Sequence, residues 1–207
     1  MAIGNSFSSP YKGSGSLTRA QFLFYEMRTT ARLMNEGLSD KEIKTRIISE
    51  NLFQYPTEKS LEQMTRVCLH RLKGISDDSL VSAIAMMDAT TAKQICLYAM
   101  MKEYRLVWDF MVTVIGQKYR QQDFTYSRRD INIFFMQLQE QDDYVASWSE
   151  STCKKIGSVL SRILIENEYI DDGKSKVLNS VLISPLLENA IRASGQELAL
   201  PAFNCLN

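Results

Sequence analysis

Residues 147–178 read SWSESTCKKIGSVLSRILIENEYIDDGKSKVL, and this stretch decides how the C-terminal part of the chain folds. It opens with small hydroxylated residues and continues with apolar residues at helical spacing, which predicts a helix over about 150–167. A charged turn at 171–174 follows, flanked by β-prone residues. The second half of the stretch therefore predicts a short β-hairpin.

The residues before this stretch complete a known order of elements. Ser127 and Asp130 can cap the start of one helix, and a short segment at about 143–147 separates it from the long helix. Helix, short helix, long helix and hairpin is the order of a winged helix-turn-helix, whose third helix enters the major groove of DNA. We therefore predict a winged-helix-like unit over 127–207, which also holds a C-terminal helix and tail.

The start of the predicted long helix carries cations, although the helix dipole disfavours them there. Hydroxyls and free amide groups at a helix start suit a phosphate, so this end of the helix is a candidate nucleic-acid contact. The candidate residues here and in the predicted wing are Ser149, Ser151, Thr152, Lys154, Lys155, Arg162, Lys174 and Lys176. The alternative is a protein-docking unit, because Glu150, Glu166 and Glu168 dilute the positive charge.

A second unit, similar to a helix-turn-helix, is predicted over 18–75. Thr18 can cap its first helix, a capping box begins at Ser39, and Pro56 forces a turn before a third helix. The candidate contacts on this third helix are Arg66 and Arg71. Since plain helical bundles share this arrangement, these two residues are the weaker candidates.

The remaining segments frame these two units. Residues 76–126 are dense in large apolar side chains at helical spacing and predict a central helical core. Residues 1–17 lack the continuous apolar core of a signal peptide and are expected to be a flexible N-terminal arm or one draped over the surface. The sequence thus predicts a mainly α protein, a helical bundle with a helix-turn-helix-like unit at the N-terminal end and a winged-helix-like unit carrying a small β-hairpin at the C-terminal end.

The charge balance limits the kind of partner. The 207 residues contain 24 Lys and Arg and 24 Asp and Glu, which gives a formal net charge of zero. This excludes a protein coated in positive charge but allows a local basic patch. The most apolar stretch, at about 105–120, is interrupted by Asp109 and is shorter than the roughly 20 residues that span a bilayer. We expect a soluble, cytoplasmic protein that does not contact a membrane.

Few residues have the chemistry of an active site. His70 is the one histidine, and no nucleophile motif lies near it. The four cysteines, Cys68, Cys96, Cys153 and Cys205, are widely spaced, which favours reduced thiols over a zinc site. No phosphate-cradling glycine motif is present. We predict a protein that is not an enzyme and that uses no cofactor and no metal.

Four segments carry a resemblance to a known family. They read FLFYEMRTTARLMNEGLSDKEIKTRIISENLFQYPTEKS, YRLVWDFM, DINIFF and VASWSESTCKKIGSVLSRILIENEYI. In this order, over about 18–192, they resemble the BrxA family of bacterial BREX (bacteriophage exclusion) systems, formerly labelled inner-membrane proteins of unknown function. The residues that match its W-S-x-x-T-x-K-K pattern are Trp148, Ser149, Thr152, Lys154 and Lys155.

The resemblance implies a small non-enzymatic component of an antiphage system, encoded beside a methyltransferase, an ATPase and a phosphatase-like protein. The family has been associated with DNA binding through helix-turn-helix units and likened to an RNA-binding antitermination factor. We therefore predict a protein that binds double-stranded DNA and has other BREX proteins as partners. The alternatives are RNA binding, or an adaptor of the same defence complex that contacts no nucleic acid. The sequence leaves the oligomeric state open.

Overall fold

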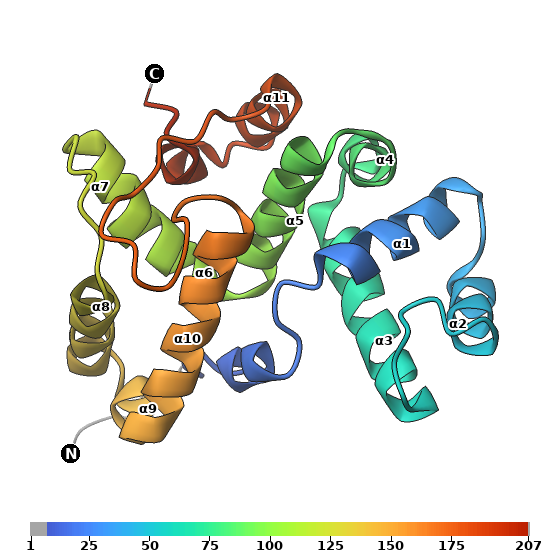
Figure 1. Cartoon of the computed structure of the whole chain (residues 1–207), viewed down its shortest axis with the longest axis horizontal. Helices are drawn as coiled ribbons and strands as arrows, with labels where there is room; N and C mark the ends of the chain where they lie inside the picture. Colours follow the sequence, from blue (N-terminus) through green and yellow to red (C-terminus); the bar gives the residue numbers. More distant parts are fainter. Residues whose placement is uncertain (1–7, 207) are drawn as a thin grey trace, which may run out of the picture.

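The computed structural model describes residues 8–206 and is built almost wholly from helices (Figure 1). The first half contains η1 (Ser14–Thr18), α1 (Phe24–Asn35), α2 (Asp40–Ser49), α3 (Glu58–Ile75), α4 (Asp78–Met86) and α5 (Ala89–Glu103). The second half contains α6 (Arg105–Phe110), η2 (Met111–Ile115), α7 (Gly116–Arg120), α8 (Arg128–Gln141), α9 (Asp143–Ala146), α10 (Glu150–Glu166), α11 (Pro185–Ala193) and η3 (Glu197–Phe203). The mainly α class is confirmed. In the described part of the chain, no helix has both the length and the apolar composition that crossing a bilayer requires.

Polar side chains begin several helices as the sequence predicts. At α2 the Ser39 amide donates to the Glu42 carboxylate over 2.8 Å, and the Glu42 amide donates back to the Ser39 hydroxyl, which completes a capping box. Thr57 caps α3 by accepting the amide of Ser60. Helices α1 to α3 then enclose a small apolar cluster of Ala20, Leu33, Ile43, Ile47, Phe53, Leu61 and Met64.

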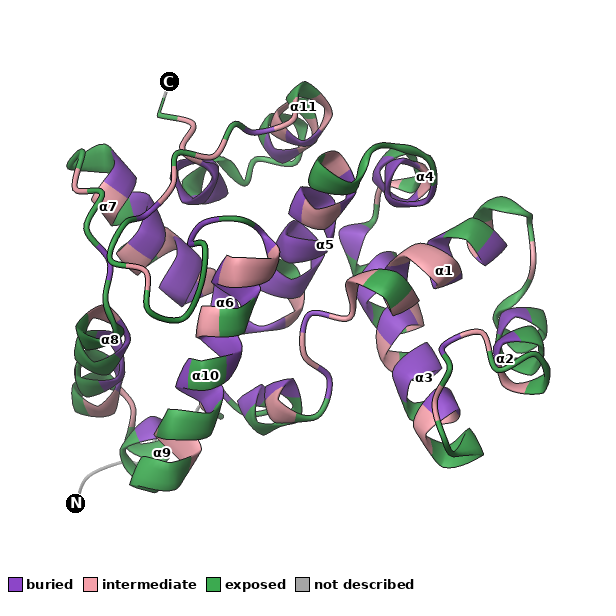
Figure 2. Ribbon diagram, in the orientation of Figure 1, coloured by how far each residue is buried: buried purple, intermediate pink, exposed green. Residues whose placement is uncertain are grey.

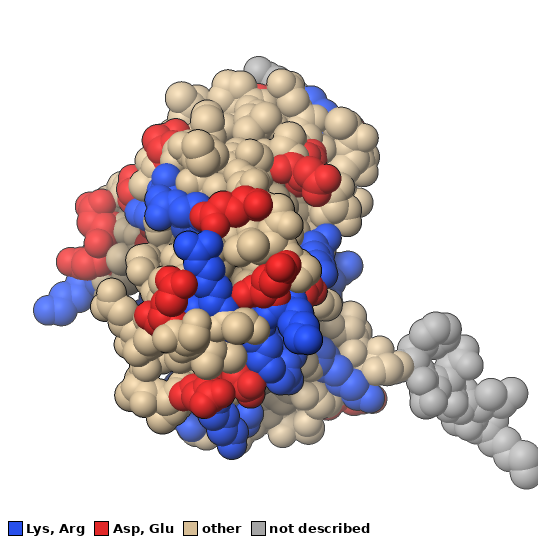
Figure 3. All heavy atoms as spheres, turned by 90° about the vertical axis from the view of Figure 1, so that its right-hand side faces the viewer, with Lys and Arg blue, Asp and Glu red and all other residues tan. Residues whose placement is uncertain are grey.

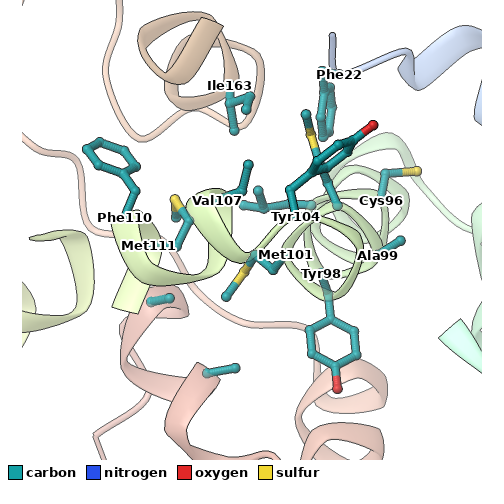
Figure 4. Close-up of a cluster of buried hydrophobic side chains, with 14 of the residues drawn as sticks. Phe22, Cys96, Tyr98, Ala99, Met101, Tyr104, Val107, Phe110, Met111 and Ile163 are labelled. Carbon is teal, nitrogen blue, oxygen red and sulfur yellow. The ribbon is translucent and has the colours of Figure 1, made fainter. Parts of the chain in front are cut away.

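A larger core forms around α5 (Figure 2). Helix α5 buries nearly all of its length, and the helices α6, η2 and α7 continue it after a bend at Tyr104. Figure 4 shows Phe22 and Ile163 on the side of α5 and α6 on which Tyr104 and Val107 also lie. The core therefore joins residues from the N-terminal, central and C-terminal parts of the chain.

The N-terminal segment lies against the body of the protein from residue 8 onward. Leu17 is fully buried in the large core, and η1 packs beside α10. The Tyr11 hydroxyl donates to the carboxylate of Asp109 over 2.9 Å. Of the two expectations for the arm over 1–17, flexibility is thus wrong within the described residues, because these residues have buried apolar and polar partners. Residues 1–7 lie outside the described residues.

The first long helix begins later than the sequence predicts. Thr18 does not cap it, because Thr18 ends η1 and its hydroxyl donates to the carbonyl of Gly15. Helix α1 begins at Phe24, after Leu23, whose φ of 57° places a bulky residue in the left-handed region. The segment between η1 and α1 is instead fixed by burial of Ala20 and Phe22.

The predicted β-hairpin is not formed. Tyr169 and Ile170, expected in its first limb, are buried, and the Tyr169 hydroxyl donates to the carbonyl of Ala202. Val177, expected in the second limb, instead forms an isolated antiparallel bridge with Thr125. The described residues therefore contain a loop after α10 that is tied to the segment before α8, rather than a projecting wing.

Candidate nucleic-acid interface

The hydroxyls at the start of α10 form hydrogen bonds with one another. The Ser149 hydroxyl accepts the Thr152 amide over 3.2 Å and lies 2.9 Å from the hydroxyls of Ser151 and Thr152. This is an ordinary helix cap. Because the cap accounts for these residues without a ligand, their predicted role as phosphate contacts stays a prediction.

Helix α10 presents its two neighbouring lysines to different surroundings. Lys154 is 2.7 Å from the Glu150 carboxylate, one turn earlier, and lines a groove of about 380 Å³ between α10 and α8. Lys155 lines a separate groove against η1. Both side chains are exposed, but only Lys155 has no ion-pair partner among the described residues. Successive residues on a helix point about 100° apart, so this separation follows from the helical period.

The groove beside η1 gathers positive charge. Its volume is about 490 Å³. We call it the basic groove, and its lining residues are Thr18, Gln21, Lys155, Ser158, Val159 and Arg162. The Arg162 guanidinium donates to the side-chain carbonyl of Gln21 over 2.9 Å, which holds the arginine across the groove. The residues lining the groove include two cations and no carboxylate.

A second cavity, of about 470 Å³, adjoins the basic groove and shares Gln21 and Arg162 with it. We call it the junction pocket, because residues from the segment before α1, from the start of α1 and from the end of α10 line it together. The lining residues used below are Arg19, Phe24, Tyr25, Glu26, Tyr55, Arg162 and Glu166. The Tyr55 hydroxyl donates to the Glu26 carboxylate over 2.5 Å. Burial raises the pKa of the Glu166 carboxyl, although the nearby Arg162 and Lys93 oppose this rise.

The two predicted wing lysines lie apart from the basic groove. Lys174 and Lys176 are exposed in the loop after the C-terminal end of α10, and the Lys176 carbonyl accepts the amide of Tyr126. Lys155 lies in the second turn of α10, whose 17 residues extend about 25 Å. The structure thus brings Lys155 and Arg162 together and leaves Lys154, Lys174 and Lys176 elsewhere.

Of the two candidates on α3, one is excluded. Arg71 is 1% exposed, and its guanidinium donates to the backbone carbonyls of Ala20, Gln21 and Phe22 and lies over the ring of Tyr104. The prediction that Arg71 contacts nucleic acid is wrong, because the residue fastens the segment before α1 to α3. Arg66 is exposed and stays a candidate.

The surface around Arg66 is mixed in charge. Lys44 pairs with Glu62 at 2.9 Å, and Lys73 pairs with Asp40 at 2.5 Å. Figure 3 shows the side of the molecule that carries α2 and α3, with acidic and basic side chains interleaved. Such neighbouring acids weaken the attraction of this face for a polyanion.

The prediction that the protein is not an enzyme stays a prediction, and the residues on which it rests have the following surroundings. His70 is exposed on α3, with its Nε2 atom 2.9 Å from the Glu103 carboxylate. Among residues 8–206, no group of three or more His, Cys, Asp or Glu side chains gathers as metal ligands do. Burial raises the pKa of the Cys68 thiol to about 12, as is typical of an inert core cysteine.

Sequence reasoning found Lys155 and Arg162 but missed the residues that complete the groove with them. Thr18 and Gln21 of the N-terminal segment line the basic groove, and Arg19 of the same segment lines the junction pocket. No periodicity relates these residues to α10, so no local signal marks them. Arg71 did carry a signal, since it continues the apolar stripe of Met64, Cys68 and Ile75 at helical spacing, whereas Arg66 lies off that stripe.

Comparison with known proteins agrees with this architecture. A protein from Bacillus cereus (strain H3081.97) named BREX protein BrxA is 38% identical over 165 residues, which cover 80% of each chain. One of the same name from Paramagnetospirillum magneticum is 25% identical and covers 84% of this chain and 87% of that protein. The fold matches a crystal structure of an uncharacterized protein from Magnetospirillum magneticum, with a TM-score of 0.76, 24% identity, and coverage of 94% and 98% of the two chains. The BrxA family model matches residues 10–195, and the chain belongs to the BrxA family.

Proposed function

We propose that this protein is a non-enzymatic, cytoplasmic component of a BREX antiphage system and that it binds double-stranded DNA through the basic groove, which Lys155 and Arg162 of α10 line. The names of the relatives support the assignment to a BREX system. The proposed DNA binding rests on one observation. In a chain of zero net charge, Lys155 and Arg162 line one groove without a carboxylate among its lining residues.

The spacing of the two cations suits a duplex. Lys155 and Arg162 are two helical turns apart, which places them about 10 Å apart along α10. The major groove of DNA is about 12 Å wide, and long basic side chains at this spacing can reach phosphates on both rims. Phosphate contacts position a protein on DNA without reading the sequence. The proposal therefore predicts affinity that depends mainly on salt and little on base sequence.

A fluorescence anisotropy titration of a labelled duplex at several salt concentrations tests this proposal. Each lost phosphate contact lowers the logarithmic salt slope by about 0.9, so Lys155→Ala combined with Arg162→Ala is expected to lower it by about 1.8. Lys154→Ala is the matched control, because Lys154 is an exposed neighbour on α10 that lies outside the groove. Equal slopes for the double variant and the parent protein would contradict the proposal.

A second function, an adaptor that holds other BREX proteins, has its own supporting observation. Met86 at the end of α4 is 76% exposed, and Leu182 before α11 is 87% exposed. Helices α4 and α11 contact each other, so these apolar side chains lie on neighbouring elements (Figure 1). Absence of any duplex binding at low salt would favour the adaptor. Competition by RNA of the same sequence decides between DNA and RNA.

A further inference from the structure

The junction pocket contains an acceptor that the protein leaves unused. Glu166 is half-buried, yet among the described residues its side chain has no hydrogen-bond or ion-pair partner. Its oxygens are not among the buried side-chain atoms that lack a partner, so water reaches them in the free protein. A ligand that displaces this water must supply donors in its place, and the pocket therefore offers an acceptor to a ligand that carries N–H groups.

Aromatic rings line the same pocket. Tyr25 is 52% exposed, and its hydroxyl is tied to the Leu52 carbonyl, which holds the ring in place. Tyr55 and Phe24 are half-buried beside it. Nucleobases stack on such rings, and unpaired bases are recognised through rings and polar groups at their edges.

Positively charged side chains also line the pocket. It shares Arg162 with the basic groove, and Arg19 lines it as well. A ligand that joins an aromatic ring carrying amino groups to a phosphate could place the ring against the tyrosines and Glu166 and the phosphate against the arginines. Carboxylates accept hydrogen bonds from amino groups such as N4 of cytosine. The volume of about 470 Å³ is in the range of small-molecule sites.

We propose that the junction pocket binds the base of an unpaired nucleotide whose phosphate lies on Arg162 and Lys155. This inference deepens the proposed function and rests on it for the phosphate contacts. A base inside a duplex is paired and stacked, so it cannot enter the pocket. The ligand is a nucleoside phosphate, and its source is either an overhang of the bound strand or a free mononucleotide.

The test compares three labelled probes with the full chain: a blunt duplex, the same duplex with a three-cytosine overhang, and the same duplex with a three-thymine overhang. The cytosine overhang is expected to bind about tenfold more tightly than the blunt duplex, which is the contribution of one stacked base. The thymine overhang should gain less, because thymine has no amino group. Titration with free cytidine monophosphate forms a separate arm and tests the mononucleotide source.

Two variants localise the effect. Glu166→Ala is expected to abolish the preference for the cytosine overhang over the thymine overhang, and its affinity for the blunt duplex should stay equal or rise, because a carboxylate near Arg162 is removed. Glu168→Ala, which removes an exposed carboxylate paired with Lys93, should leave the preference for cytosine unchanged. Circular dichroism verifies folding. Equal affinity for all three probes, with no cytidine monophosphate bound, would overturn the proposal that the pocket binds a base but would not contradict the proposed binding of duplex DNA. Binding of cytidine monophosphate without affinity for any strand overturns the duplex function and supports the pocket as a mononucleotide site.

Discussion

Arg162 and Gln21 lie 141 residues apart in the chain and are joined by a hydrogen bond of 2.9 Å. The bond crosses from α10 to the segment between η1 and α1, so it connects the C-terminal helices to the N-terminal segment. It also sets the direction of the guanidinium in the basic groove. Gln21 therefore positions a proposed DNA contact without carrying charge itself.

Gln21→Ala is expected to weaken duplex binding about threefold while leaving the salt slope unchanged, because no phosphate contact is removed. Arg162→Gln should lower the slope by about 0.9. Anisotropy titrations at four salt concentrations separate the two effects. A lower slope for Gln21→Ala would show that the residue does more than orient Arg162.

Arg71→Met should lower the free energy of unfolding by roughly 3 kcal/mol, because three backbone carbonyls lose their donor and each orphaned acceptor costs about 1–3 kcal/mol. Arg66→Met, on the exposed side of the same helix, should change it by less than about 0.5 kcal/mol. Urea denaturation followed by circular dichroism gives both values. Similar stability of the two variants would mean that the Arg71 contacts contribute little.

Gly116 and Gly74 both lie in helices but have different surroundings. A methyl group on Gly116 would lie 3.1 Å from the backbone nitrogen of Ala202 and 3.2 Å from the carbonyl carbon of Pro201, whereas nothing lies within 4 Å at Gly74. We expect Gly116→Ala to destabilise the protein by about 1 kcal/mol through overpacking. Gly74→Ala should stabilise it by about 0.5–1 kcal/mol through helix propensity. Thermal denaturation checks the opposite signs, and equal shifts would contradict the close packing of α7 on η3.

Asp123 should make stability sensitive to acid. Its carboxylate lies 2.8 Å from Lys118 and accepts the Thr125 hydroxyl, and these contacts hold the pKa of Asp123 far below its usual range. The ionised form thus favours the folded state. Its contribution is fully present above the unfolded pKa of about 4 and is lost as the pH falls toward the lower folded value.

Asp123→Asn is therefore expected to be less stable than the parent protein at pH 7, and the difference in stability should be clearly smaller at pH 2.5, where part of the carboxylate's contribution has been lost. Glu140→Gln, a change at an exposed position near the end of α8, should differ little from the parent at either pH. Denaturation curves at the two pH values provide the measurement. A stability difference for Asp123→Asn that is unchanged at pH 2.5 would exclude this ionic contribution.

Local signals were sufficient for most of the helices. The capping pairs at Ser39 and Ser127 mark true helix starts, because both partners lie within one turn. Thr18 shows the limit, since it has the right chemistry for a cap but burial of Ala20 and Phe22 delays the helix to Phe24. Long-range packing overrides a local preference there.

The candidate site was less predictable. Lys154 and Lys155 line different grooves because the helical period points neighbouring residues in different directions. The pairing of Lys154 with Glu150 has the spacing of a helical ion pair. The groove itself depends on Gln21 meeting Arg162, which no pattern within either segment encodes. The predicted hairpin was wrong because Val177 forms its one bridge with Thr125, upstream of α8, and not with the neighbouring limb.

The placement of Leu17 has a consequence for how the molecule is made. Leu17 lies in the large core, and η1 packs beside α10, which the ribosome produces more than a hundred residues later. Helices α1 to α3 have their own apolar cluster and can begin to consolidate while translation continues. The nascent chain, by contrast, must keep Leu17 without its final cover until α10 has been made and has left the ribosome, so the core around Leu17 closes much later than the apolar cluster of α1 to α3.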